Sequence, residues 1–251
     1  LCDRRQRQMC IRDRDDSLVQ KPGMLEVSHV SFAYPGGEKI YEDFNLSAFP
    51  GQIIGVTGAV ACGKSTLGKT FLCEYPYEGR ICFHGKELSG MTKAEQNGMV
   101  GYLGHDPELF NDSVRNNILL GDDDDPEKYL KAVCFDGEVA EMEEGMDTIV
   151  GNGGVRLSGG QAQRLALART LCHKRPVLIL DDPFSALDRK TEEEVFANLR
   201  KFTADSIVIL LSHRLYLFPE MDQVLWMEAG KVTAGTHEQI LAKFPEYARL
   251  Y

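Results

Sequence analysis

The sequence lacks a hydrophobic run long enough to cross a membrane. Its longest apolar stretches, such as residues 207–211, are far shorter than the roughly 20 residues that a membrane-spanning helix needs. It also lacks an apolar segment near its beginning, which argues against a secretory signal peptide. The sequence therefore predicts a chain that does not cross a membrane by itself.

Cysteine pairs and positive charge are also scarce. The seven cysteines include no Cys-x-x-Cys spacing, so neither a disulfide framework nor a zinc site is predicted, and a reducing cytosol suits them. Lysine and arginine number 28 against 38 aspartates and glutamates, which gives a net charge of −10. Such a balance argues against a broad nucleic-acid-binding face, and we predict no nucleic-acid partner.

The beginning of the chain differs from the rest. Of the 251 residues, 43% are hydrophobic and 26% charged, which is typical of a soluble globular protein with one large domain. Residues 1–16 instead hold five arginines among acidic residues without periodicity, and residues 5–14 resemble translated sequencing-adapter text. We interpret residues 1–16 as a non-native or disordered leader, with a natural basic linker as the alternative. Residues 17–23 are interpreted as a linker and residues 24–251 as the domain; since no methionine starts the chain, we expect a fragment of a longer protein.

The most informative segment is a glycine-rich loop at residues 58–65, which fits the pattern G-x-x-x-x-G-K-[ST] without a gap. Two glycines let the backbone turn tightly, so that successive N–H groups can point at phosphate oxygens. Lys64 supplies a full positive charge for the β- and γ-phosphates, and the Ser65 hydroxyl can ligate Mg²⁺. A buried strand is predicted before the loop, and a helix after it whose positive end would favour an anion. The predicted phosphate-binding residues are Gly58, Ala59, Val60, Ala61, Cys62, Gly63, Lys64, Ser65 and Thr66.

Strand and helix patterns alternate along the rest of the chain. Apolar and polar residues alternate in the first part of the domain, which predicts strands near residues 24–33 and 41–50. The apolar runs 177–180 and 207–211 are typical of strands that are buried on both faces of a parallel sheet. The predicted helices span residues 127–134, 138–142, 159–172 and 191–202.

Residues 157–161 read Leu-Ser-Gly-Gly-Gln and begin the predicted helix 159–172. A Ser-Gly-Gly start can be a plain helix cap, and it can also offer a hydroxyl and free N–H groups to an anion. With the phosphate loop upstream and the run 177–181 downstream, this pentapeptide resembles the signature of the ATP-binding cassette (ABC) family, and the resemblance covers residues 24–251. It implies an α/β P-loop NTPase core with an antiparallel β subdomain and an inserted α-helical signature subdomain at about residues 106–170.

The resemblance also implies a site that two chains share. In the family, two such domains associate head to tail, and the signature of one covers ATP held by the phosphate loop of the other. Asp188, in the segment 185–188, matches the loop that crosses the seam between the two domains. The residues that would cover the partner's nucleotide are Ser158, Gly159, Gly160 and Gln161.

Two adjacent carboxylates follow the apolar strand 177–180. The resemblance implies that Asp181 holds Mg²⁺ through water, together with Ser65. Active members usually carry next a glutamate, the base that polarises the attacking water, whereas this chain carries Asp182. The aspartate is one methylene, roughly 1.5 Å, shorter, and a misplacement of about 1 Å can slow a reaction on the order of 100-fold. We expect either a weak base or a backbone shift that restores its position.

Three further residues match or depart from the family pattern. His213, after the strand 207–211, matches the switch histidine that contacts the γ-phosphate. Tyr34 matches the aromatic residue that stacks on adenine, with an ordinary surface aromatic as the alternative. His105 stands where the family has a glutamine that contacts Mg²⁺ and the attacking water, and a neutral imidazole can still ligate or hydrogen-bond.

We interpret the chain as an exporter-like ABC nucleotide-binding domain that uses ATP and Mg²⁺ at the cytoplasmic face of a membrane. Its predicted partners are a second ABC domain and a transmembrane domain fused upstream. Residues 110–118 look exporter-like, whereas residues 151–154 replace a Glu-Arg pair that exporters usually carry. Because Asp182 and His105 depart while the signature is intact, we also hypothesise the degenerate-site half of a heterodimer. The alternatives are a non-transport ABC-type ATPase acting on DNA or ribosomes, for which heptad runs and a basic face are missing, and a nucleotide-gated module with little turnover.

Overall fold

The structure is a computed structural model that describes residues 23–151 and 153–251. The leader predicted at residues 1–16, all of the predicted linker except Gly23, and Asn152 lie outside the described residues.

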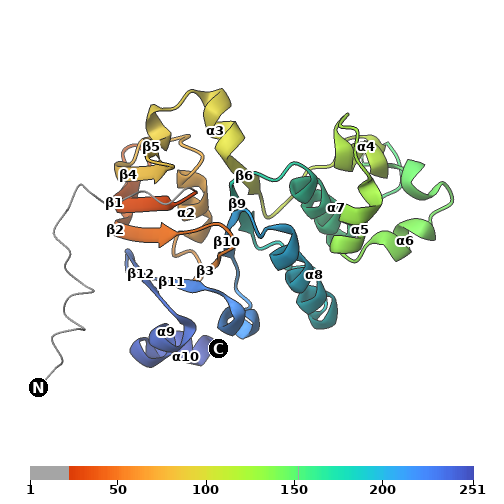
Figure 1. The fold of residues 1–251 in the computed structure, drawn as a ribbon. Coiled ribbons are helices and arrows are strands. Elements are labelled where there is room, and N and C mark those ends of the chain that lie inside the picture. The colour runs from red at the N-terminus through yellow and green to blue at the C-terminus, as the bar shows by residue number, and fades with distance from the viewer. Residues whose placement is uncertain (1–22, 152) are drawn as a thin grey trace, which may run out of the picture.

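One large sheet runs through the described part of the chain (Figure 1). Its strands are β1 (Leu25–Ala33), β2 (Lys39–Ala48), β3 (Ile53–Gly58), β4 (Glu78–Phe83), β5 (Lys86–Glu87), β6 (Val100–Leu103), β9 (Val177–Asp181), β10 (Ile207–Leu211), β11 (Gln223–Glu228) and β12 (Lys231–Gly235). The strand order is β5-β4-β1-β2-β12-β11-β3-β10-β9-β6. Strands β11, β3, β10, β9 and β6 pair in parallel, whereas β5, β4, β1 and β2 pair antiparallel. Two short strands, β7 (Asp112–Ser113) and β8 (Ile149–Val150), form a separate pair.

The parallel strands are the most deeply buried part of the sheet. Every residue of β3, β9 and β10 is buried, because helices cover both faces of a parallel sheet and apolar residues are needed on each. In β9, Leu178 and Leu180 join one core cluster, whereas Val177 and Ile179 join the other. The sheet therefore separates two cores, and the strands predicted from unbroken apolar runs are confirmed.

Helices pack on the sheet and also form a group beside it. They are α2 (Lys64–Thr70), α3 (Lys93–Met99), α4 (Val114–Leu119), α5 (Pro126–Ala132), α6 (Asp136–Ala140), α7 (Gly159–Cys172), α8 (Arg189–Phe202), α9 (His237–Lys243) and α10 (Pro245–Leu250). Figure 1 shows α4, α5, α6 and α7 gathered at one side of the sheet, in the connection from β6 to β9. The predicted fold class, an α/β core with an antiparallel part and a helical insertion, is confirmed. None of the described helices combines the length and hydropathy that spanning a bilayer requires.

Buried Asn117 fixes the loop between β6 and α4. Its side chain is fully buried, accepts a hydrogen bond from the Phe110 backbone N–H at 2.9 Å and donates to the Phe110 carbonyl at 3.0 Å. The same amide donates to the Asp112 carbonyl at 3.2 Å and the Ser113 carbonyl at 3.0 Å. The loop that carries His105 is thereby fixed to α4 of the helical group, which consists of α4, α5, α6 and α7.

Replacing Asn117 with alanine is expected to lower the free energy of unfolding by about 2 kcal/mol, because buried backbone groups would lose their partners. Urea denaturation measures this loss. The matched control is Asn116→Ala, an exposed neighbour of the same residue type, for which a change below about 0.5 kcal/mol is expected. Equal losses in the two variants would contradict the structural role given to Asn117.

Candidate active site

The glycine-rich loop at residues 58–65 joins β3 to α2, and both of its glycines are required by close contacts. Gly63 has a φ of +100°, and a Cβ there would lie 2.4 Å from Ile40 Cγ2. A Cβ on Gly58 would lie 2.4 Å from the Met227 carbonyl oxygen. No side chain fits at those distances, so the loop geometry depends on glycine at both positions.

The lysine of this loop turns inward. Lys64 is 8% exposed, and its Nζ donates to the carbonyls of Gly58 at 3.1 Å and Ala59 at 3.0 Å. Its ammonium also lies 3.8 Å from Cys62 Sγ. The positive charge is therefore held inside the arc of the loop, where the backbone surrounds it.

A cavity of about 280 Å³ opens at the carboxyl edge of the parallel strands, next to this loop. Residues that follow β6, β9 and β10 meet there, as expected for parallel strands whose carboxyl ends share one edge. The structure thus brings together six residues that the sequence singled out from four separate segments. The lining residues are Lys64, Ser65, His105, Asp181, Asp182, Leu211, Ser212 and His213.

Asp181, at the end of β9, is almost fully buried and has a specific partner. The Tyr102 hydroxyl donates to Asp181 Oδ2 at 3.0 Å. Burial raises the pKa of Tyr102, and the negative charge of Asp181 raises it further. The Tyr102 hydroxyl therefore stays protonated and can donate. No sequence motif marks Tyr102 as a site residue; its position follows from the pairing of β6 beside β9, which sets Tyr102 opposite Ile179.

Asp182 is held by its backbone in a left-handed conformation, with a φ of +51°. Its N–H donates to the Leu211 carbonyl at 2.9 Å, and its carbonyl accepts from Gln163 Nε2 at 2.8 Å. Burial raises the pKa of the Asp182 carboxyl and outweighs the opposing effect of the nearby charges, of which His213 is the largest. His105 Nδ1 lies 3.9 Å from Asp182 Oδ2. The departures at 105 and 182 are therefore neighbours in space.

The oxygen atoms at the cavity fit Mg²⁺, although the protein alone does not enclose it. Ser65 and Asp181 line the same cavity, and Mg²⁺ is usually held by one or two protein oxygens together with water and substrate phosphates. In the described chain, no three or more His, Cys, Asp and Glu side chains form a metal cluster. An imidazole nitrogen is a less suitable Mg²⁺ ligand than oxygen, so His105 as a metal ligand stays a prediction.

The signature turn begins α7 and forms a capping box. Ser158 Oγ accepts from the Gln161 N–H at 3.3 Å, and Gln161 Oε1 accepts from the Ser158 N–H at 2.9 Å. Of the four predicted residues, Ser158, Gly159, Gly160 and Gln161, none lines the cavity described above. Within one chain, the signature and the phosphate loop are thus two separate sites.

Glu138 of α6 supports this turn, and sequence analysis did not predict it. Its carboxylate accepts from Gln161 Nε2 at 2.7 Å and from the Arg164 guanidinium at 2.6 Å. Burial alone would raise the pKa of Glu138, but the hydrogen bonds from Gln161 and Arg164 outweigh it and lower the pKa. The Ser-x-x-Gln spacing predicts the cap, whereas a contact over more than 20 residues of sequence leaves no local signal.

Tyr34 lies beside the start of α2, as a base-stacking residue requires. Tyr34 is 37% exposed, and its ring packs edge-on against Tyr75 and Phe32, with centroids 5.3 Å and 5.1 Å away. Its hydroxyl lies 3.4 Å from Thr66 Oγ1. An exposed ring that neighbouring aromatic rings hold in place can present one face to a flat base.

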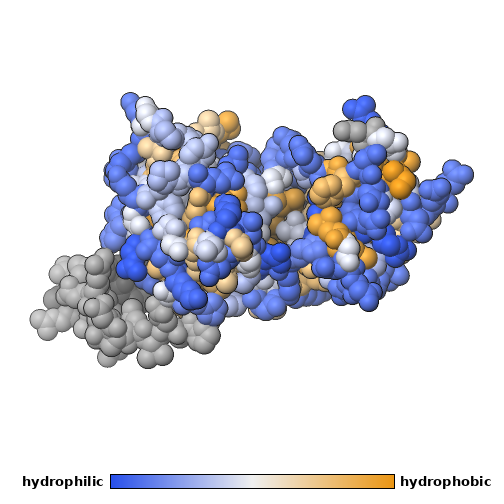
Figure 2. All heavy atoms as spheres, turned by 90° about the horizontal axis from the view of Figure 1, so that it is seen from above, coloured by the Kyte–Doolittle hydropathy of each residue, from blue (hydrophilic) through white to orange (hydrophobic). Residues whose placement is uncertain are grey.

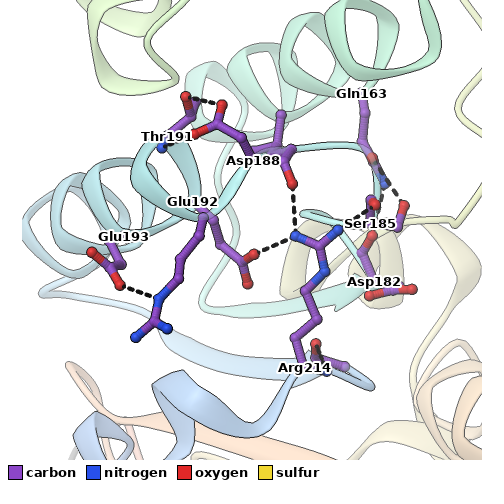
Figure 3. A network of polar contacts seen from close by, with 11 residues as sticks. Gln163, Asp182, Ser185, Asp188, Thr191, Glu192, Glu193 and Arg214 are labelled. Atoms are coloured by element: carbon purple, nitrogen blue, oxygen red, sulfur yellow. Dashed lines mark hydrogen bonds and ion pairs between the residues drawn. The ribbon is translucent and has the colours of Figure 1, made fainter.

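Asp188 and Arg214 organise the segment that follows Asp182 (Figure 3). Asp188 caps α8 by accepting from the Thr191 N–H at 3.1 Å and hydroxyl at 2.6 Å, and these bonds lower the pKa of Asp188. Arg214, which follows His213, donates to Glu192 Oε2 at 2.6 Å, and this bond raises the pKa of Arg214. Sequence analysis did not predict Arg214 or Glu192 as functional residues.

The chain is similar in sequence and structure to known proteins of one family. A family model described as ABC transporter matches residues 41–185. The chain is 35% identical over 240 residues to a probable multidrug resistance ABC transporter ATP-binding/permease protein of Bacillus subtilis, covering 93% of this chain and 41% of that protein. It is 38% identical over 242 residues to an ATP-dependent lipid A-core flippase of Pseudomonas syringae, covering 93% and 40%. A bacterial Atm1-family ABC exporter solved with ATP bound is similar with a TM-score of 0.84 and 29% identity, covering 93% of this chain and 42% of that one.

The chain belongs to the ABC transporter family. It is an exporter-like nucleotide-binding domain, and domains of this family in exporters are ATPases. The chain spans about two fifths of the length of the two curated relatives. The family predicted from the phosphate loop and the signature is therefore confirmed.

Proposed function

We propose that this domain binds ATP with Mg²⁺ and closes head to tail on a second ABC domain, thereby driving export through a transmembrane partner. The observation that carries this proposal is the separation of two sites within one chain. Lys64, Asp181, Asp182 and His213 meet at one cavity, whereas the exposed Ser158 turn lies outside it. A second copy of the turn can then complete the first site.

Each residue at the cavity has a role that its position supports. The phosphates would lie in the loop 58–65, with Lys64 donating to their oxygens and the exposed ring of Tyr34 stacking on adenine. Ser65 and Asp181 would hold Mg²⁺, which when bound neutralises charge on the β- and γ-phosphates. Asp182 would accept a hydrogen bond from the attacking water.

His213 and the signature would act on the end of the phosphate chain. His213 lines the same cavity as Lys64 and would donate to the γ-phosphate. The partner's copy of Ser158, with the backbone N–H groups at the start of its α7, would bind the same phosphate from the other side. Hydrolysis would remove that shared anion, and the two domains would separate.

The proposed contact with the transmembrane partner lies on the helical group. Figure 2 shows apolar side chains gathered at the surface of this part of the molecule, whereas the rest of that face is mainly hydrophilic. A hollow of about 410 Å³ is lined by Pro107, Glu108, Leu109, Gly151, Arg156, Leu157 and Ala162. Exposed large apolar residues in this part are Phe110, Leu120, Ile149 and Val155. The partner would hold the chain at the cytoplasmic face of a membrane.

We also propose that this chain is the degenerate-site half of a heterodimer. Asp182 has a short side chain for a base, and the residue opposite it is His105 at 3.9 Å rather than the family's glutamine. The signature, in contrast, is intact and supported by Glu138. This chain would therefore complete the partner's site better than it turns over its own ATP.

Light scattering in the presence of ATP and Mg²⁺ tests the two-chain proposal. Asp182→Asn removes the charge of the proposed base and keeps the binding loop, so this variant is expected to double in mass when ATP is added. The control adds Lys64→Ala to the same variant, and its mass should not change. A chain that binds ATP and stays single in both cases would contradict a head-to-tail pair of two identical chains, and salt-dependent DNA binding would favour the non-transport alternative.

A further inference from the structure

The loop between β9 and α8 is held by side chains from two other elements (Figure 3). Gln163 of α7 donates to the Asp182 carbonyl at 2.8 Å and accepts from the Ser185 hydroxyl at 3.2 Å. Arg214, after β10, donates to the Ser185 and Leu187 carbonyls, both at 2.7 Å. Three backbone carbonyls of one short loop are thus fixed by two long polar side chains.

Arg214 is itself anchored by a buried charge. Glu192 of α8 is fully buried, and its Oε2 accepts from Arg214 at 2.6 Å. Its Oε1 has no hydrogen-bond partner in the described part of the chain. Because a buried carboxylate strongly requires its cation, Glu192 holds the guanidinium in place. The exposed pair Arg189–Glu193 on the same helix has no such constraint.

The position of Arg214 in the chain places this anchor next to the nucleotide site. The residue before it, His213, lines the cavity together with Lys64 and Asp182. The loop that Arg214 holds ends at Asp188, the residue expected at the seam between two domains. His213, which lines the cavity, and Arg214, which holds the loop facing the neighbouring chain, are therefore adjacent residues.

We propose that Arg214 is a positioning residue that couples His213 to the loop 185–188, so that ATP in one site sets the loop facing the other. The inference rests on the proposed head-to-tail pair. A movement of His213 toward a γ-phosphate carries the Arg214 backbone with it. The guanidinium passes this movement to the Ser185 and Leu187 carbonyls, since the same planar group binds both. Neither His213 nor Arg214 needs to contact the nucleotide in the other site.

Hydrogen exchange tests the coupling without a second chain when every variant also carries Ser158→Arg, which blocks the signature and keeps the chain single. In this background, ATP with Mg²⁺ is expected to slow exchange of the amides of residues 185–188 about tenfold. The variant Arg214→Met/Glu192→Leu removes the link without leaving a buried charge, and should lose this slowing while its ATP affinity changes less than about threefold. The matched control, Arg189→Met/Glu193→Leu, removes the exposed pair on the same helix and should behave like the chain that carries Ser158→Arg alone. Retention of ATP-dependent slowing in the Arg214 variant would overturn the inference.

Mixed pairs of chains then distinguish two roles of Arg214. One is coupling between the two ATP sites, and the other is local support, in which Arg214 only stabilises the loop within its own chain. One chain carries Asp182→Asn, so that it binds ATP without turning it over, and the Arg214→Met/Glu192→Leu change is placed on this chain. We expect turnover at the remaining site to fall about fivefold, because the altered loop faces that site. Unchanged turnover would overturn the inference, since local support acts only within one chain. If mixed pairs have no turnover even with Arg214 present, the proposed two-chain site fails, and the hydrogen-exchange result decides whether the coupling exists.

Discussion

Replacing Asp182 with glutamate is expected to raise ATP turnover by this chain on the order of tenfold to 100-fold. The added methylene extends the carboxylate from the end of β9 further into the cavity that Lys64 and His213 also line. ATP affinity should stay within about threefold, because the phosphates bind to the loop and not to the base. Phosphate release at saturating ATP measures the first effect, and nucleotide titration measures the second.

The matched control is Asp205→Glu, which lengthens an aspartate that pairs with Lys174 and does not line the cavity. It should leave turnover unchanged. If Asp182→Glu gave no increase, the left-handed backbone at Asp182 would already place the shorter side chain correctly. The proposal of a degenerate site would then be wrong, whereas the family assignment would stand.

Replacing Lys64 with alanine is expected to weaken ATP binding about 100-fold or more. Lys64 is 8% exposed, and its ammonium donates to the Gly58 and Ala59 carbonyls. A buried cation held by backbone carbonyls gains strongly from an anionic partner, because charge-assisted hydrogen bonds are the stronger ones. Binding of a fluorescent ATP analogue gives the affinity directly.

Lys69→Ala is the control for that experiment, because Lys69 lies on the same helix α2 with an exposed side chain. Its removal should change the affinity less than about twofold, since exposed charges are screened by salt. An affinity that is the same in both variants would mean that ATP does not bind at residues 58–65. Unchanged melting temperatures of the two variants without nucleotide would show that folding is not the cause.

Much of the fold could be predicted from the chain alone. The helix at 159–172 and the strand at 207–211 have the predicted bounds, because an intact cap begins the helix and an unbroken apolar run defines the strand. The helix α3 was missed although Thr92 and Glu95 form a capping box that the sequence displays. The helices α4, α9 and α10 are only six or seven residues long; segments this short owe their helical state to packing more than to local pattern.

The site also has a part that could be predicted from the sequence and a part that could not. The residues that match motifs, such as Lys64 and His213, meet at one cavity because parallel strands end at one edge of the sheet. Their supporting partners could not be predicted: Tyr102 contacts a residue 79 positions away, and Arg214 contacts one 22 positions away. Such pairs depend on how the strands and helices are arranged, and no local pattern specifies them. The catalytic and binding roles of the motif residues stay predictions.

Mixing two inactive variants tests the shared site most directly. Lys64→Ala inactivates the phosphate loop and keeps the signature, whereas Ser158→Arg blocks the signature and keeps the loop. If the two sites complete each other across a head-to-tail pair, each variant alone is inactive, and an equal mixture regains about a quarter of the normal ATP turnover, from one intact site in each mixed pair. A mixture as inactive as its components would show that the Ser158 turn of one chain does not complete the site of the other.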